Sequence, residues 1–314
     1  MPCLVDHGPR RILVTGASGF VGRHLLAALA RSYEGAILAT EPFDVCDEEA
    51  ARTAVRDAAP DSCVHLAGIT AVGQAREKPD RAWQVNLHGT LNLARAVLAH
   101  APDCRFLLIS SAEAYGASFR TGGKLDETAP LAPMNTYAAT KAAADLAIGA
   151  MVTEGLQAIR LRPFNHTGPG QTDAFVVPAF ARQLARIAAG LQPPVMRVGA
   201  LDPARDFLDV RDVCAAYAAC LLQPNTRLPP GTILNLASGT PRRIGDVLAE
   251  MCWIAGIDAE IEPESGRLRP SDIPVACGDS GLARELLGWS PVIPWDQTLR
   301  DVLDDWRARI AGQN

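Results

Sequence analysis

The chain has 314 residues, of which 48% are hydrophobic and 21% charged, and its formal net charge is −5. These values are typical of a globular protein with one large or two modest domains. The acidic balance excludes a broad basic surface for nucleic acid, and no apolar run approaches the roughly 18 residues of a membrane span. We therefore expect neither nucleic acid nor a membrane as a partner.

Two further features bear on where the protein works. The first residues lack the charged-then-apolar layout of a signal peptide. The eight cysteines are scattered along the chain without a C-x-x-C pair, which favours reduced thiols and gives no metal site. We expect a cytoplasmic protein.

The first half of the chain alternates short apolar runs with helical patterns. Apolar spacing of three and four predicts helices at 24–30, 81–98 and 137–152. Strands that alternate with helices form a parallel sheet with helices on both faces, and ligands bind at the carboxyl ends of its strands. We therefore predict a Rossmann-type, doubly wound α/β domain. Its strands are expected at 12–15, 36–40, 63–67, 105–110 and 158–161.

The pattern changes after Leu161. The stretch 162–171, Arg-Pro-Phe-Asn-His-Thr-Gly-Pro-Gly-Gln, is rich in turn residues, and irregular structure is predicted there. A strand at 232–236 and helices at 177–190, 210–222, 244–255 and 295–310 are expected beyond it. We assign 1–164 with about 206–240 to the dinucleotide-binding domain, and 165–205 with 241–314 to a smaller C-terminal α/β substrate lobe.

Three glycines follow the first predicted strand. Gly16, Gly19 and Gly22 have the spacing G-x-x-G-x-x-G and precede a helix rich in alanine and leucine. Glycines let the backbone turn tightly and approach a pyrophosphate, which rests on the N-terminus of the helix that begins near Phe20. A glycine triplet alone is often a plain turn, but its position between strand and helix predicts a dinucleotide site.

The choice between NAD and NADP stays open. Glu41 lies about 20 residues past the glycines, where an acidic side chain binds a ribose 2′-hydroxyl and repels a 2′-phosphate. Arg23, directly after the third glycine, could approach a phosphate or equally be a solvated side chain of the first helical turn.

A proton donor and its partners are found further along the chain. Tyr137 and Lys141 are four residues apart on a predicted helix and share a face. A tyrosine can protonate a carbonyl oxygen if a neighbouring ammonium lowers its pKa from about 10. Ser111, at the end of a strand, can hydrogen-bond the same oxygen. The Y-x-x-x-K pair alone could be a surface pair, but after a dinucleotide loop it predicts a hydride-transfer site.

These motifs together resemble the extended short-chain dehydrogenase/reductases that act on nucleotide sugars, over nearly the whole chain. Within that family, 162–171 is most similar to the enzymes that reduce GDP-4-dehydro-6-deoxy-D-mannose at C4 to GDP-D-rhamnose. The resemblance implies NADPH or NADH as cofactor, a GDP-4-keto-6-deoxy-hexose as substrate, and a homodimer formed through the helices at 81–98 and 137–152. The blocks that carry the resemblance are 16–22, 65–68, 86–90, 111–116, 137–141 and 205–213.

The resemblance also implies a role for individual residues. Arginines suit a diphosphate because a planar guanidinium can bind phosphate oxygens bidentately. The implied catalytic residues are Ser111, Tyr137, Lys141 and Glu113. The implied cofactor contacts are Gly16, Gly19, Phe20, Val21, Gly22, Asp44, Val45, Leu66, Ala67, Gly68, Tyr137 and Lys141. The implied substrate contacts are Ser111, Ala112, Asn165, Val177, Arg205, Arg267 and Arg269.

Glu113 keeps a second activity open. GDP-mannose 4,6-dehydratases carry a catalytic glutamate two residues before the same Tyr-Gly pair, and Ser111-Ala112-Glu113 resembles that pattern. Those enzymes follow their Asn-His pair with a charged segment and a Phe-Val-Thr-Arg-Lys run. This chain instead has Gly168-Pro169-Gly170, and later Phe175-Val176-Val177-Pro178, which favours a reductase.

The stereochemistry of the product stays open as well. The orientation of the sugar decides which face of C4 the hydride attacks, so the epimeric product GDP-6-deoxy-D-talose, or a different nucleotide-sugar epimerase or dehydratase reaction, is not excluded. A protein that had kept the fold and lost catalysis would show damage among Ser111, Tyr137 and Lys141, and all three are present.

Overall fold

The computed structural model describes residues 10–264 and 273–312. Its larger part is built on a six-stranded parallel sheet with the order β2-β1-β3-β4-β5-β9. The chain runs outward from β1 to β2 and returns to β3, so the strand order reverses beside β1, where such sheets bind ligands. The strands are β1 (Arg11–Thr15), β2 (Ile37–Ala39), β3 (Ser62–His65), β4 (Arg105–Ile109), β5 (Ala158–Pro163) and β9 (Ile233–Leu236).

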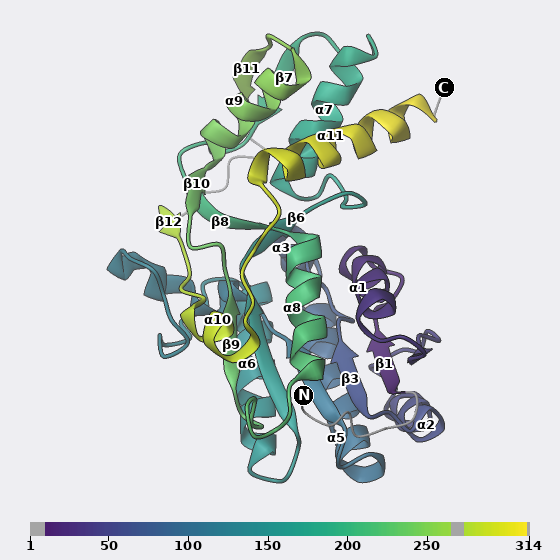
Figure 1. Cartoon of the computed structure of the whole chain (residues 1–314). Helices are drawn as coiled ribbons and strands as arrows, with labels where there is room; N and C mark the ends of the chain where they lie inside the picture. Colours follow the sequence, from purple (N-terminus) through teal and green to yellow (C-terminus); the bar gives the residue numbers. More distant parts are fainter. Residues whose placement is uncertain (1–9, 265–272, 313–314) are drawn as a thin grey trace.

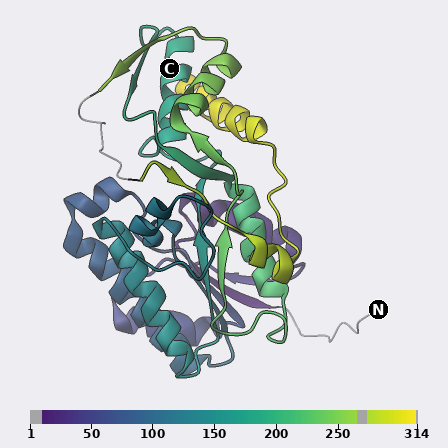
Figure 2. The same cartoon turned by 90° about the vertical axis from the view of Figure 1, so that its left-hand side faces the viewer.

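Helices cover both faces of this sheet (Figures 1 and 2). Alternate strand residues enter different cores: Ile12 and Val14 pack with α1 and α8, whereas Leu13 packs with α2, α5 and α6. Burial on both faces explains why the strands are continuous apolar runs rather than alternating ones. The helices are α1 (Phe20–Ser32), α2 (Glu48–Ala58), α5 (Thr90–His100), α6 (Thr136–Val152) and α8 (Val210–Leu222).

Local sequence sets where several of these helices begin. The Asp47 side chain accepts hydrogen bonds from the backbone N–H groups of Glu49 and Ala50, and so caps α2. Asn135 caps α6 in the same way through the N–H of Ala138, at 2.8 Å. This cap matters for the site because Tyr137 is the second residue of α6.

A smaller lobe stands above the carboxyl ends of the parallel strands (Figure 1). Its core joins α7 (Val176–Ala188), α9 (Ile244–Ala255) and α11 (Trp295–Ala311) over Phe207 of β8. Its strands are short and come from distant parts of the chain. They are β6 (Asn165–Thr167), β8 (Ala204–Asp209), β10 (Pro241–Arg243) and β12 (Val275–Ala276) in one sheet, and β7 (Val195–Val198) with β11 (Glu260–Pro263) in another.

The predicted fold class is confirmed, and the elements differ from prediction in three places. The stretch 162–171 is not wholly irregular, because β5 continues to Pro163 and β6 pairs with β8. The helix predicted at 81–98 consists of α4 (Pro79–Trp83), a π-helix η1 (Gln84–Gly89) and α5. No sequence pattern predicts the remaining elements, which are α2, α3 (Val72–Glu77), the 3-10 segment η2 (Ala112–Thr121), α10 (Gly281–Leu287) and the strands β7, β8, β10, β11 and β12.

One helix of the C-terminal part packs away from the small lobe. Ala283 and Leu287 of α10, with Trp289 after it, belong to the same core as α1 and α8. We therefore propose that 281–289 return to the dinucleotide-binding domain, within the range assigned above to the substrate lobe. Among the helices in 10–264 and 273–312, none is long and apolar enough to cross a membrane.

Candidate active site

The glycine loop between β1 and α1 has the close contacts that a dinucleotide cradle requires. Gly16 has a φ of +70°, and a Cβ placed on it would lie 2.8 Å from the backbone nitrogen of Ala67. A Cβ on Gly22 would lie 2.4 Å from the carbonyl oxygens of Gly16 and Ala17. Both positions therefore exclude any larger residue. The open N-terminus of α1, with no side-chain cap at Gly19, leaves its N–H groups free to receive a pyrophosphate.

The end of β3 lies against this loop. The N–H of Leu66 donates to the Thr15 carbonyl at 3.3 Å, and the N–H of Ala67 donates to the Thr15 hydroxyl at 3.2 Å. Gly68 lies close to α6, since a Cβ placed on it would be 3.8 Å from Nζ of Lys141. The structure thus brings together Gly16, Leu66, Ala67, Gly68 and Lys141, as the sequence predicts for residues that line one cofactor.

The remaining predicted cofactor residues lie on either side of the loop. The ring of Phe20 stacks on His166 at 6.4 Å and so faces the start of the small lobe. Val21 is half-buried, and its carbonyl accepts from the Cys214 thiol of α8. Val45, 4% exposed, packs against η1. Asp44 is exposed, and its pKa is lowered, chiefly by the hydrogen bond from the backbone amide of Cys46.

The proposed catalytic groups meet at the carboxyl end of β4. Ser111, Tyr137 and Lys141 are all buried, at 7%, 8% and 9% exposure. The Ser111 hydroxyl caps η2 by accepting from the N–H of Glu113 at 3.2 Å, and it is close enough to the Tyr137 phenol to lower the pKa of that group. Nζ of Lys141 donates to the Ile109 carbonyl at 2.7 Å. Two segments that are well separated in the sequence, the end of β4 and the start of α6, therefore converge on one point.

The electrostatics of this site differ from the sequence-based expectation. Burial raises the pKa of Tyr137 to about 12, the hydrogen bond with Ser111 lowers it in part, and the charge of Glu113 raises it. Burial also lowers the pKa of Lys141 to about 8. Burial dominates the pKa of Tyr137, and the Lys141 ammonium donates to the Ile109 carbonyl, so a lowering of the Tyr137 pKa by Lys141 stays a prediction.

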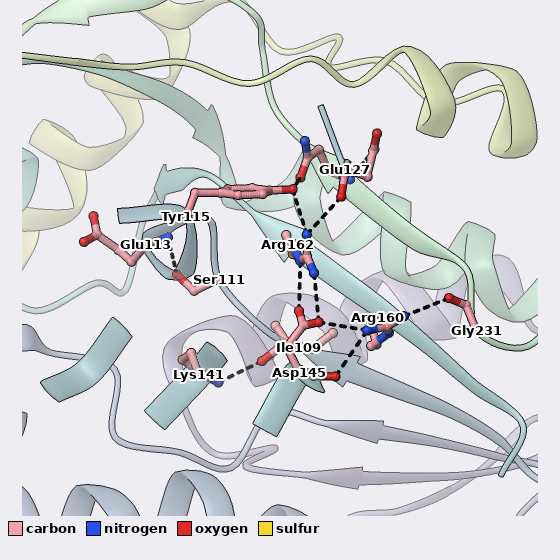
Figure 3. A network of polar contacts seen from close by, with 11 residues as sticks. Ile109, Ser111, Glu113, Tyr115, Glu127, Lys141, Asp145, Arg160, Arg162 and Gly231 are labelled. Carbon is pink, nitrogen blue, oxygen red and sulfur yellow. Dashed lines mark hydrogen bonds and ion pairs between the residues drawn. The ribbon is translucent and has the colours of Figure 1, made fainter. Parts of the chain in front are cut away.

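Glu113 and Arg205 connect this site to the small lobe. The half-buried Glu113 side chain points away from the residues around Arg162 (Figure 3). Arg205 comes from β8 of the lobe and donates to the carbonyls of Ala204 and Ile273, at 2.8 and 3.1 Å. Burial lowers the pKa of Arg205, and the negative charge of Glu113 opposes that shift. The charge of Glu113, in the dinucleotide-binding domain, thus acts on Arg205, in the lobe.

The other predicted substrate residues are placed unequally. Asn165 is exposed on β6. Ala112 is 5% exposed and packs in a cluster with aromatic residues. Val177 is 1% exposed and lies in the core of the lobe. Both side chains therefore leave little surface for a ligand. Arg267 and Arg269 lie outside the described residues.

Asn86 is a site-facing residue to which the sequence analysis gave no role. It is 2% exposed in η1, and its amide exchanges two hydrogen bonds with the backbone of Ile69 at 2.8 and 3.0 Å. It also donates to the Thr140 hydroxyl, next to Lys141, at 3.0 Å. Asn86 therefore ties the loop after β3 to α6. The π-helical turn that contains it is of a kind often found at functional sites.

The structure also has a cavity of about 730 Å³ at the opposite edge of the parallel sheet. Its lining includes Arg10, Asp61 and Arg105, near the amino ends of the strands. The guanidinium of Arg105 is already bound to the carbonyl of Cys220 at 2.6 Å and to other groups of the same loop. This cavity therefore lies away from the proposed catalytic residues, and the hydrogen bonds of Arg105 give that side chain a structural role.

The glycine cradle, the doubly wound sheet and the buried Ser111, Tyr137 and Lys141 define a dinucleotide-dependent enzyme of nucleotide-sugar metabolism. The chain belongs to the NAD dependent epimerase/dehydratase family, whose sequence model matches residues 12–237. The membership predicted from the motifs is thus confirmed.

Individual relatives are also similar along nearly the whole chain. GDP-6-deoxy-D-mannose reductase of Pseudomonas aeruginosa is 38% identical, over 96% of this chain and 98% of its own length. GDP-6-deoxy-D-talose 4-dehydrogenase of Aggregatibacter actinomycetemcomitans is 27% identical over 88% and 91%. The solved structure of RMD from P. aeruginosa complexed with NADPH superposes with a TM-score of 0.88, at 37% identity, over 96% of this chain and 99% of that one.

Proposed function

We propose that this protein reduces the C4 ketone of GDP-4-keto-6-deoxy-D-mannose to give GDP-D-rhamnose. The observation that carries the proposal is the buried Tyr137, which lies near Ser111 and, with Lys141, beside the glycine cradle. The reductase from P. aeruginosa, 38% identical over almost its full length, supports the choice of substrate.

The residues that would hold the cofactor fit a dinucleotide. Gly16 and Gly22 let the loop at the start of α1 pack tightly against its own backbone and the end of β3, and Gly68 lies beside Lys141. The nicotinamide, when bound, supplies the hydride. We propose NADPH or NADH for this role. The solved relative binds NADPH, whereas the exposed Glu41 after β2 favours a free 2′-hydroxyl.

The chain's own groups would manage the proton and the developing charge. The phenol of Tyr137, with its pKa raised to about 12, stays protonated at neutral pH and is a donor to the ketone oxygen. The Ser111 hydroxyl lies within reach of the same oxygen and stabilises its charge as the hydride arrives. Lys141, whose ammonium donates to the Ile109 carbonyl, would hold the cofactor ribose and assist Tyr137.

Product analysis tests this proposal. Purified protein, GDP-4-keto-6-deoxy-D-mannose and NADPH or NADH should give one GDP-D-rhamnose for each reduced cofactor consumed, identified by NMR. GDP-6-deoxy-D-talose as the product would keep the chemistry and reverse the face of hydride attack. No consumption of either cofactor would refute the proposed function.

The second candidate is dehydration of GDP-mannose, and it is favoured by the charge of Glu113 close to Tyr137. A dehydratase returns the hydride to the sugar, so it converts GDP-mannose without net consumption of cofactor. Our proposal predicts no reaction with GDP-mannose. Rapid formation of the 4-keto-6-deoxy sugar from GDP-mannose by the pure protein would replace the reductase assignment with a dehydratase.

We further propose that the protein works in the cytoplasm as a homodimer that pairs α5 and α6 with their copies. Leu146 on α6 is 61% exposed, which suits a face that a second copy covers. The free thiols among the described cysteines suit a reducing compartment. The mass in solution, measured by light scattering, tests the dimer, and a monomeric mass would contradict it.

A further inference from the structure

A buried carboxylate lies one helical turn beyond Lys141. Asp145 on α6 is fully buried, at 0% exposure. Two arginines of β5 bind it: Arg162 from both its Nε and its Nη2 at 2.9 Å, and Arg160 from its Nη1 at 3.1 Å (Figure 3). Burial opposes the negative charge, but Arg162 outweighs this effect, and the pKa of Asp145 is lowered. The group is therefore a carboxylate at every working pH.

The two arginines that bind Asp145 contact different parts of the protein. Arg162 donates from its Nη1 to the Tyr115 hydroxyl at 3.0 Å, and its guanidinium lies 5.1 Å from the centre of the Tyr115 ring. The Tyr115 hydroxyl in turn donates to the Asn235 side chain at 2.8 Å. Arg160 instead donates to the Gly231 carbonyl at 3.2 Å, at the opposite end of the network. Of these two arginines, Arg162 is the one that connects Asp145 with η2 through Tyr115.

This connection joins the two halves of the proposed site. Tyr115 lies on η2, four residues after Ser111 and two after Glu113. Asp145 lies on α6 with Tyr137 and Lys141. Buried ion pairs gain little net stability, because desolvation offsets their attraction, and their best-documented use is to fix one arrangement of packed elements. Arg162 binds Asp145 of α6 through two nitrogens and Tyr115 of η2 through a third. It is therefore suited to fix these two elements relative to each other.

We propose that Asp145 is a positioning residue: through Arg162 and Tyr115 it holds η2, which carries Ser111, in register with α6, which carries Tyr137 and Lys141. The inference rests on the proposed function for its effect on turnover, and on geometry alone for its effect on η2. A small displacement of reacting groups lowers the rate strongly, whereas a shift of η2 leaves the cofactor residues after β1, after β3 and on α6 in place.

The charge of Asp145 acts on Lys141 as well. It raises the pKa of Lys141, against the larger lowering by burial. Burial lowers the pKa of His65, at the end of β3, to about 3, so that its imidazole is neutral. The ammonium of Lys141 in turn acts on His65 and also lowers its pKa. Removal of the Asp145 charge should therefore make Lys141 lose its proton at lower pH.

The test compares variants of the two arginine branches in the full-length protein. Tyr115→Phe removes one hydroxyl, and Arg162→Met breaks the link at its centre. Arg160→Met is the matched control, because it removes an arginine from the same carboxylate without any contact to Tyr115. Turnover, KM for the cofactor, NADPH affinity by calorimetry and hydrogen–deuterium exchange of peptides covering 110–121 are measured for each.

Tyr115→Phe and Arg162→Met should lower kcat about tenfold or more, leave NADPH affinity within about twofold, and speed exchange in 110–121. Arg160→Met should keep kcat within about twofold and leave exchange in 110–121 unchanged. Asp145→Asn should lower kcat like Arg162→Met and shift the alkaline limb of the pH–rate profile to lower pH.

Three results would overturn the positioning role. The first is wild-type kcat and wild-type exchange in both Tyr115→Phe and Arg162→Met. The second is an equal fall of kcat in Arg160→Met, which would assign the carboxylate to stability alone. The third is a loss of NADPH affinity as large as the loss of kcat. If the wild-type protein does not reduce the keto sugar, the proposed function fails, and the exchange data still decide whether η2 is held by this link.

Discussion

The dinucleotide-binding domain and the small lobe hold their proposed functional groups in opposite ways. In the domain, Ser111, Tyr137 and Lys141 are buried close together, and Ser111 and Lys141 are hydrogen-bonded to the backbone. In the lobe, Asn165 is exposed, and Arg205 is half-buried and bound to backbone carbonyls. The difference indicates that the packed core of the domain fixes the chemical groups, whereas the recognition groups of the lobe are more accessible.

One loop connects the two regions. The carbonyls of Pro169 and Gly170 accept from His24 at 2.7 Å and from Arg23 at 3.3 Å, both on α1 of the domain. The N–H of Gly170 donates to Asp305 on α11 of the lobe at 3.0 Å. Both halves of the molecule thus meet at the loop before α7.

The largest effect is expected in the domain. Tyr137→Phe removes a single hydroxyl from the proposed proton donor, and turnover should fall by about 10²-fold or more, as is typical when a general acid is lost. The melting temperature and NADPH affinity should change little, because the ring still fills its apolar site beside Ile69. Turnover within a few-fold of the wild type would remove Tyr137 from the mechanism.

A change in the lobe should affect binding of one ligand only. Arg205→Ala should weaken GDP binding about tenfold or more, since a charge-assisted contact with phosphate contributes roughly 1.5–3 kcal/mol. NADPH affinity should stay the same, because Arg205 lies on β8 and the glycine loop follows β1. Calorimetry with each ligand separates the two sites, with Arg243→Ala on the exposed surface of β10 as the control. Equal loss for both ligands would contradict the division of roles.

The smallest effect is a pH dependence that only the domain should show. Burial lowers the pKa of Lys141 to about 8, so its ammonium is present below that pH and lost as the pH rises through it. The kcat/KM for the cofactor, which reports groups of the free enzyme, should therefore fall on the alkaline side with an apparent pKa near 8. GDP affinity should stay flat over the same range. A rate that holds constant to about pH 9.5 would show that Lys141 need not be charged.

Some of this protein was determined by local sequence. The strand–glycine–helix order at the start of the chain requires that Gly16 and Gly22 lie at a tight turn, and the spacing of Tyr137 and Lys141 places them on one helix face. The alternation of buried strands with helices was sufficient to predict the parallel sheet, because each strand packs against helices that are its neighbours in sequence. Each of these features follows a fixed period or spacing of residues, so it can be recognised in the sequence.

Tertiary structure alone decided the rest. The strands of the lobe have two to six residues, too few for a periodic pattern, and they pair with segments far away in the chain. The bond from Lys141 to the Ile109 carbonyl, the network from Asp145 to Tyr115 and the Asn86 link to α6 also join distant segments. The direction in which each pKa shifts depends on burial by those segments. Desolvation and long-range contacts arise only when the chain is packed, and for that reason the sequence located Tyr137 without revealing what holds it in place.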